Sequence, residues 1–280
     1  MRFVTALLLW IVTTAALAVA VPAVWAQRNV VDADGYSAFA ASAAKDPRLQ
    51  QAVAGELATQ VSSLLSQHGF EAPADLVHGV ASAYTASASF PGQFARANQI
   101  VHRWLFTDSA QQSDEGWVID LAPMLSDTSF QQALAAFNVE VPQSLTVPVT
   151  VTESTGLHPG QLRSLARWGP WVSVGAPVLA GILALLTLAA ARARGKALAA
   201  LGVSALLVGG AGWAAPEVAR RYIDDALNHT SGDMRQIADA MVSHAIGSLH
   251  QWLNLTLAGG VVLVVLGVFV SMVASLRRKS

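Results

Sequence analysis

The order of hydrophobic and polar positions divides the chain into four uncharged stretches and the polar segments between them. The stretches are residues 3–26, 171–191, 197–215 and 252–276, and none contains Asp, Glu, Lys or Arg. Each is near or above the roughly 20 residues that a helix needs to cross the hydrocarbon layer. A charge at the centre of such a helix costs about 2.5–3.5 kcal/mol on insertion scales, so the four stretches predict four transmembrane helices.

Helical patterns follow the first stretch over residues 32–107. Asp34 is expected to cap a short first helix, and Asp46-Pro47 predicts the start of a second that ends at His68-Gly69. Pro73 and Pro91 open two more predicted helices. Their apolar stripes consist of Leu49, Val53, Leu57, Val61, Leu64 and Leu65, then Leu76, Val77, Val80 and Tyr84, then Phe94, Ile100, Val101, Trp104 and Leu105.

The pattern changes to alternation between residues 116 and 153. Trp117, Ile119 and Leu121 alternate with Val118 and Asp120. Over residues 146–152, three valines alternate with threonines and one proline, and such alternation is typical of strands. A helix is predicted between them at 127–138. Strand, helix and strand in this order favour a right-handed crossover with parallel pairing, so a small βαβ element is expected.

The segment 216–251 is also predicted to be helical. Pro216 is expected to begin one helix, and Thr230 with Asp233 matches a capping box before a second. We expect this second helix to continue without a break into the fourth apolar stretch. The small residues expected to let the third and fourth stretches pack closely are Gly209, Gly210, Gly212, Gly259, Gly260 and Gly267.

Charge is divided sharply between the two sides of the predicted membrane. The two termini and the turn 192–196 hold seven basic residues and no acidic one, whereas all eighteen Asp and Glu lie in 27–170 and 216–251 with ten basic residues. The positive-inside rule therefore places both termini and the turn in the cytoplasm, in a plasma-membrane protein. A basic footprint for nucleic acid is absent.

The resulting fold class is mainly α, with four transmembrane helices. An α-rich extracytoplasmic domain that contains the small βαβ element lies between spans 1 and 2, and a helical outer loop lies between spans 3 and 4. Residues 1–26 are predicted to be a retained anchor, with a cleaved signal peptide ending at Ala26 as the alternative. The later boundaries divide the chain into an outer domain 27–170, a transmembrane hairpin 171–215, an outer loop 216–251, and a last span with a basic tail, 252–280.

Candidate chemistry is sparse in this sequence. The chain has no cysteine, which excludes disulfides and thiol catalysis, and its seven histidines form no i,i+4 pair. We predict no catalytic, metal or cofactor-binding residue. Two polar pairs share helix faces, Asn98 with His102 and Asp225 with His229, and we interpret them as packing or solvated clusters.

The order of several segments resembles a family of uncharacterised integral membrane proteins from actinobacteria. The resemblance covers roughly residues 25–200 and includes the basic turn after the second span. It implies the membrane topology and an actinobacterial cell envelope, with no catalytic residue. The segments that carry it are Trp25, Val31-Asp32-Ala33-Asp34-Gly35-Tyr36, Ala44-Lys45-Asp46-Pro47-Arg48-Leu49-Gln50, Phe94-Ala95-Arg96-Ala97-Asn98, His102-Arg103-Trp104 and Trp117-Val118-Ile119-Asp120-Leu121.

These patterns favour a non-enzymatic interaction or scaffold module of the cell envelope that acts through its extracytoplasmic domain. Its partners would be the lipid bilayer and envelope proteins, with no cofactor. The alternative is an accessory that binds a lipid or another apolar ligand for a transport system, which needs a pocket between the apolar stripes. An envelope enzyme would need Asp114, Asp120 and His102 to converge in one cleft. The sequence leaves the oligomeric state open.

Overall fold

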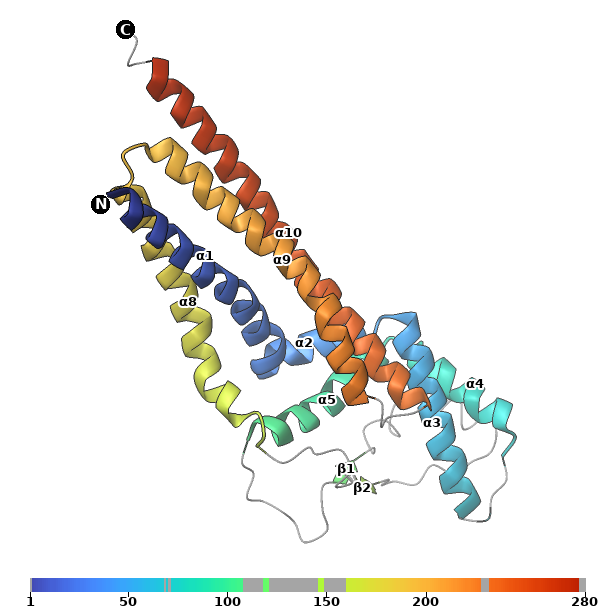
Figure 1. Ribbon diagram of the computed structural model, residues 1–280. Coiled ribbons are helices and arrows are strands. Elements are labelled where there is room, and N and C mark those ends of the chain that lie inside the picture. Colours follow the sequence, from blue (N-terminus) through green and yellow to red (C-terminus); the bar gives the residue numbers. More distant parts are fainter. Residues whose placement is uncertain are drawn as a thin grey trace. The chain divides into compact units, whose positions relative to one another are not determined.

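The computed structural model describes residues 2–67, 69, 72–107, 118–120, 146–148, 160–227 and 232–276 of the chain. It consists almost entirely of helices (Figure 1). Two compact units can be separated by their internal contacts. Unit 1 contains Met1–Val30, Arg167–Asp225 and Ala245–Ser280, and unit 2 contains Val31–Ala166 and Ala226–His244.

Four helices are long and apolar enough to cross a membrane, as the uncharged stretches predict. The candidate spans are Val4–Val31, Arg163–Ala190, Arg194–Tyr222 and Gly232–Leu276. They belong to helix α1 (Arg2–Ala26) with the π-helix η1 (Gln27–Val31), and to α8 (Arg163–Ala190), α9 (Arg194–Leu227) and α10 (Gly232–Leu276). Length and composition do not place the surfaces of a bilayer, so the predicted boundaries at 26, 170, 215 and 251 stay predictions.

Helix α9 runs further than the sequence pattern indicates, whereas α10 runs as predicted. Pro216 was expected to begin a new helix but lies inside α9, so that prediction is wrong. A proline lacks the N–H of one intrahelical bond, yet neighbouring elements can compensate for it in spanning helices. The expected continuation of the last outer helix into the fourth span is confirmed, because α10 runs for 45 residues without a break.

Unit 1 packs through small and hydroxylated residues. An added Cβ on Gly202 of α9 would lie 2.6 Å from the carbonyl oxygen of Gly260 on α10, and one on Gly267 would lie 2.4 Å from the backbone nitrogen of Ala199. Such contacts leave room only for glycine and hold the two helices close together, as expected for spans three and four. Gly209 and Gly212 also face α10, whereas a Cβ on Gly210 or Gly259 would meet nothing within 4 Å.

Helix α1 is fixed between α8 and α9 by side-chain hydrogen bonds. The Trp10 indole N–H donates to the carbonyl of Ala200 on α9 at 2.8 Å. The hydroxyl of Thr14 is 2.8 Å from that of Ser204 on α9, and the hydroxyl of Thr13 is 3.5 Å from that of Thr187 on α8. Polar links of this kind join helices in an apolar medium, where packing has little hydrophobic driving force.

Unit 2 contains four further helices built around two helix pairs. They are α2 (Ala33–Ala43), α3 (Pro47–Gln67), α4 (Ala74–Thr85) and α5 (Phe90–Phe106), and α2 packs on α5 while α3 packs on α4. The predicted starts at Asp46-Pro47, Pro73 and Pro91 agree with these bounds. The predicted cap of α2 is wrong, because Asp32 and not Asp34 accepts the hydrogen bond from the Gly35 N–H, at 2.7 Å.

The apolar stripes of unit 2 pack against one another. Leu49 of α3 is fully buried with Ala43, Ala44, Tyr84 and Phe90, and the partly buried residues around them come from α3, α5 and the first turns of α10. A second cluster joins α3 to α4 through Ala54, Ala58, Val77 and Ala81. The stripes of residues 49–65 and 94–105 and the start of α10 therefore contribute to a closed core, which is the arrangement that counts against an apolar-ligand pocket between them.

The predicted βαβ element is not supported. Strands β1 (Val118–Asp120) and β2 (Thr146–Pro148) pair antiparallel, with Ile119 opposite Val147. Parallel pairing was therefore a wrong prediction, and no crossover is needed. Period-two alternation marks a strand but carries no information on its direction, and antiparallel pairs are the commoner kind. The helix predicted at 127–138 lies outside the described residues.

Candidate functional site

The predicted polar pair on α5 meets α2. The hydroxyl of Tyr36 donates to Asn98 Oδ1 at 3.1 Å, and the amide of Asn98 donates to the carbonyl of Phe94 in its own helix at 2.9 Å. The ring of His102 stacks on Tyr36, with 4.8 Å between centroids and 27° between planes. Both members of the pair therefore help to pack α5 on α2.

A column of five rings extends from this contact, and we call it the ring column. Between ring centroids, Phe106 stacks on His102 at 4.3 Å, Phe39 lies 6.4 Å from Tyr36, and His244 tilts against Phe39 at 5.1 Å. His102 and Phe106 are buried, and burial raises the pKa of the Tyr36 phenol above its ordinary value. Because the His102 ring is buried and stacks on two other rings, the ring column is suited to packing.

The other predicted pair is Asp225 with His229. Asp225 is exposed near the end of α9 in unit 1, whereas Asn98 and His102 belong to unit 2. His229 lies outside the described residues. The predicted pairing of Asp225 with His229 therefore stays a prediction.

Residues with metal-ligating side chains stay apart in the structure. Among the described residues, no group of three or more His, Cys, Asp or Glu is placed to hold a metal ion. His244 contacts Phe39, and His250 stacks flat on Trp213, with 3.7 Å between centroids and 8° between planes. Asp114 lies outside the described residues, so the three-residue convergence that an enzyme would need stays untested.

Sequence reasoning missed an aromatic cluster in unit 1. Trp213 of α9 stacks on His250 and donates its indole N–H to Asn254 Oδ1 at 3.2 Å. The Trp25 indole donates to Ser248 Oγ at 3.2 Å, and the Arg28 guanidinium lies 5.6 Å from the centroid of Trp252. Amphipathic tryptophans of this kind gather at the level of lipid headgroups. The signal was present in the sequence, because Trp25, Trp213 and Trp252 each lie at or near one end of an uncharged stretch.

Two buried polar atoms of unit 1 have no hydrogen-bond partner within the described residues. They are Oε1 of Gln27 in η1 and Nε2 of His250 in α10. Buried polar atoms are nearly always satisfied in folded proteins, by water where no protein group is near. Their position in the segments that carry Trp25 and Trp252 fits a level where water and lipid headgroups supply partners.

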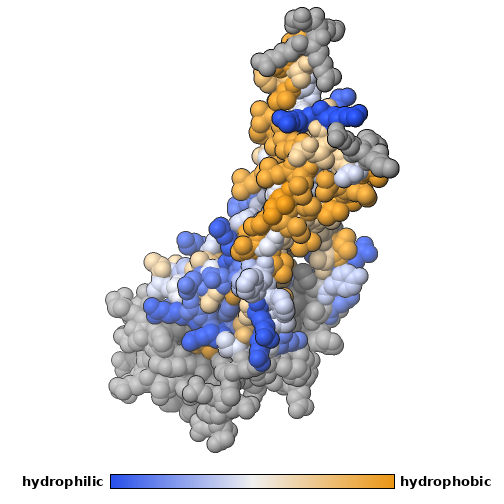
Figure 2. All heavy atoms as spheres, turned by 90° about the vertical axis from the view of Figure 1, so that its left-hand side faces the viewer, coloured by the Kyte–Doolittle hydropathy of each residue, from blue (hydrophilic) through white to orange (hydrophobic). Residues whose placement is uncertain are grey.

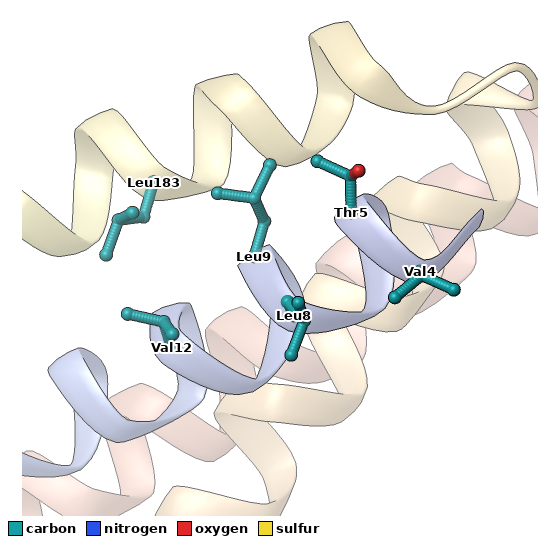
Figure 3. A pocket seen from close by; sticks show the side chains of 6 residues that line it. All are labelled: Val4, Thr5, Leu8, Leu9, Val12 and Leu183. Atoms are coloured by element: carbon teal, nitrogen blue, oxygen red, sulfur yellow. The ribbon is translucent and has the colours of Figure 1, made fainter. Parts of the chain in front are cut away.

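An apolar pocket of about 660 Å³ lies between α1 and α8. Figure 3 shows Leu9 and Val12 of α1 extending toward the helix that carries Leu183. Charged groups are absent from its lining, and a single hydroxyl, that of Thr5, interrupts the hydrocarbon surface. The residues that line the pocket are Val4, Thr5, Leu8, Leu9, Val12 and Leu183.

Comparison of the chain with protein-family models, curated protein sequences and solved structures finds no match. The resemblance to an actinobacterial membrane family therefore stays a prediction.

Proposed function

We propose that the protein is a multi-pass plasma-membrane protein whose extracytoplasmic domain is a non-enzymatic interaction or scaffold module. The observation that carries this proposal is the contrast in exposed apolar surface between the two units. Among the residues whose side chains are described, Val101, Leu165 and Met234 are the only large hydrophobics that unit 2 exposes. Unit 1 exposes large hydrophobics along all four of its helices, and Figure 2 shows a large apolar area on the face in view.

The polar surface of unit 2 supports the interaction role. The outward face of α3 carries Arg48, Gln51, Thr59, Gln60 and Ser63, all exposed. Such a face suits contact with water or with another protein, and the apolar residues behind it are committed to the core. The alternative, an accessory that carries an apolar ligand between the stripes, gains no support from this packing.

Site-specific photo-crosslinking in intact cells tests the interaction role. A photoreactive residue at Gln51 or Gln60 is expected to capture one or a few defined proteins reproducibly. The same residue at Leu255 or Phe269, two exposed hydrophobics of α10, is expected to react mainly with lipid. If the α3 positions crosslink no more protein than these two positions of α10, the proposal is contradicted.

The orientation follows from the charge partition and can be tested separately. Because the chain has no cysteine, Asp75→Cys and Arg194→Cys each introduce a single thiol. We expect a membrane-impermeant maleimide to label the first in intact cells and the second only after lysis. The reverse pattern would place the acidic segments in the cytoplasm.

We also propose that residues 1–26 are retained as a membrane anchor. The support is the set of hydrogen bonds that Trp10, Thr13 and Thr14 make with α8 and α9, since these bonds make the first helix part of the packing of unit 1. The intact mass of the purified protein tests this. A mature chain that begins at Gln27 would contradict it.

A further inference from the structure

The hydrogen bonds of α1 determine which end of the α1–α8 pocket borders the basic turn. Trp10 pairs with Ala200 and Thr14 with Ser204, and both pairs are separated by 190 positions, so α1 runs parallel to α9. The same register places Val4 at the level of Arg194. The end of the pocket that Val4 and Thr5 line therefore lies beside the turn that carries the exposed Arg192, Arg194 and Lys196.

The opposite end of the pocket is set by its remaining lining residues. Leu183 precedes Ala190, the last residue of α8, by seven positions, or about 11 Å along the helix, and Val4 to Val12 cover about 12 Å. These lengths match one half of a hydrocarbon layer about 30 Å thick. The pocket therefore follows the acyl chains of a single leaflet, beginning at the headgroup level of the basic turn.

Charge at this end of unit 1 is of one sign. The sequence contains no Asp or Glu between Glu153 and Glu217, so the guanidinium groups of Arg192 and Arg194 have no acidic neighbour in the helices α8 and α9 that they join. Arginines beside the membrane attract the phosphate of anionic lipids. The side of the pocket is open as well, since Val4, Leu8 and Val12 are exposed.

We propose that the α1–α8 pocket binds one acyl chain of an anionic phospholipid whose headgroup lies on Arg192 and Arg194. The occupant is a lipid because the pocket is apolar, opens laterally within the spanning region, and ends beside the basic side chains of the turn, where the sequence places no acidic residue between Glu153 and Glu217. Its volume of about 660 Å³ lies in the range of about 300–1,000 Å³ found for small-molecule sites. The proposal concerns unit 1 and is independent of what unit 2 binds.

The test is native mass spectrometry of the full chain in detergent with added phosphatidylglycerol or phosphatidylcholine. We expect one phosphatidylglycerol to bind at least about fivefold more tightly than phosphatidylcholine, the effect of one headgroup contact with a basic side chain. The double variant Arg192→Gln and Arg194→Gln is expected to abolish this preference. The matched control, Arg220→Gln with Arg221→Gln, neutralises two exposed arginines near the other end of α9 and should leave it unchanged.

A variant that fills the pocket tests the contact with the acyl chain independently of the contact with the headgroup. Val12→Trp is expected to lower the binding of both lipids, whereas Val265→Trp, at an exposed position of α10, is expected to lower neither. Equal binding of the two lipids by the wild type would overturn the proposal, and so would retention of lipid in Val12→Trp. A dimer that Val12→Trp dissociates would show that a second copy fills the pocket, which would also overturn it.

Discussion

The helix contacts of unit 1 bury Thr13, Thr187, Ser204 and a set of glycines beside Leu201, Val208 and Leu253, whereas Leu49, Tyr84 and Phe90 lie in the core of unit 2. Many large hydrophobics of unit 1 are exposed, whereas unit 2 exposes few of those described. The difference follows from the surroundings of each unit. Water drives apolar side chains into a core, whereas lipid tails let apolar side chains stay at the surface. One chain can therefore pack its helices in two ways. The burial of the side chains distinguishes the two ways better than composition alone.

Removing one phenylalanine from each unit tests this difference in packing most strongly. Phe90→Ala deletes a fully buried ring of unit 2 and should destabilise it by about 3–5 kcal/mol. Phe269→Ala removes a ring that is 63% exposed in unit 1 and should change stability by no more than about 0.5 kcal/mol. Denaturant unfolding of the purified protein in detergent measures both, and equal losses would mean that Phe269 is buried against another element.

Glycine substitutions test the packing rule of unit 1. Gly202→Leu forces a side chain into the backbone of α10 and should cost about 1–3 kcal/mol, the usual result of overpacking. Gly210→Leu is the matched control, because a Cβ there meets nothing within 4 Å. Titration with a denaturing detergent gives both values. If Gly202→Leu is as stable as the control, α9 and α10 do not meet at this seam.

The Tyr36 hydroxyl extends the comparison to a polar contact, because this partly buried group lies in the unit whose core is mainly apolar. Tyr36→Phe removes its bond to Asn98 and should cost about 0.5–1.5 kcal/mol at neutral pH. Burial raises the pKa of Tyr36 above the ordinary value of about 10, so the folded state holds this proton more tightly than the unfolded state. The associated stabilisation is complete below pH about 10 and is lost as the pH rises through the folded-state pKa.

Unfolding of wild type and Tyr36→Phe across that pH range provides the measurement. The difference between them should shrink above pH about 10, because only the wild type has the Tyr36 proton to lose. Asn98→Ala serves as a companion variant that removes the acceptor but keeps the phenol. A constant difference between wild type and Tyr36→Phe at all pH values would mean that Tyr36 titrates as an exposed phenol.

The smallest expected effect comes from the hydroxyl pair of unit 1. A double-mutant cycle with Thr14→Val and Ser204→Ala should give a coupling of about 0.6 kcal/mol, with about 1.7 kcal/mol as the upper limit for such pairs in membranes. Thr256 is the control, since the hydroxyl bond described for it goes to the carbonyl of Trp252 in its own helix. Coupling between Thr256→Val and Ser204→Ala should be absent. A zero value for the Thr14 cycle would show that this contact does not hold α1 in place.

Local signals in the sequence predicted much of the helical framework. The four spans follow from the lack of charge over about 20 residues, and the starts of α3, α4 and α5 follow from Pro47, Pro73 and Pro91. The glycine seam could have been predicted more completely. Gly195, Gly202 and Gly209 recur every seven positions on α9, as do Leu253, Gly260 and Gly267 on α10, and a seven-residue repeat is the signature of two helices that pack along their length.

Contacts between residues far apart in the chain could not be predicted in this way. Tyr36 and Asn98 are 62 positions apart, and nothing near either residue specifies the other. The antiparallel direction of the β1–β2 pair likewise depends on the path of the chain between the two strands. The alternation of apolar and polar residues does not specify it. The pocket between α1 and α8 requires the register of helices that are more than 150 residues apart, which the apolar pattern of each helix leaves undetermined.

The hydroxyls of α1 also have a consequence for synthesis. At a ribosome speed of about 5–20 residues per second, α1 is made roughly 10–40 seconds before Ser204 emerges. During that interval Thr13 and Thr14 would face lipid without the helices they later contact. Each also donates to a carbonyl within α1, Thr13 to Leu9 at 2.6 Å and Thr14 to Trp10 at 2.9 Å. Both hydroxyl donors of α1 therefore have hydrogen-bond acceptors within α1 before α8 and α9 are synthesised. The helix can be stable in the bilayer alone and pack with α8 and α9 afterwards.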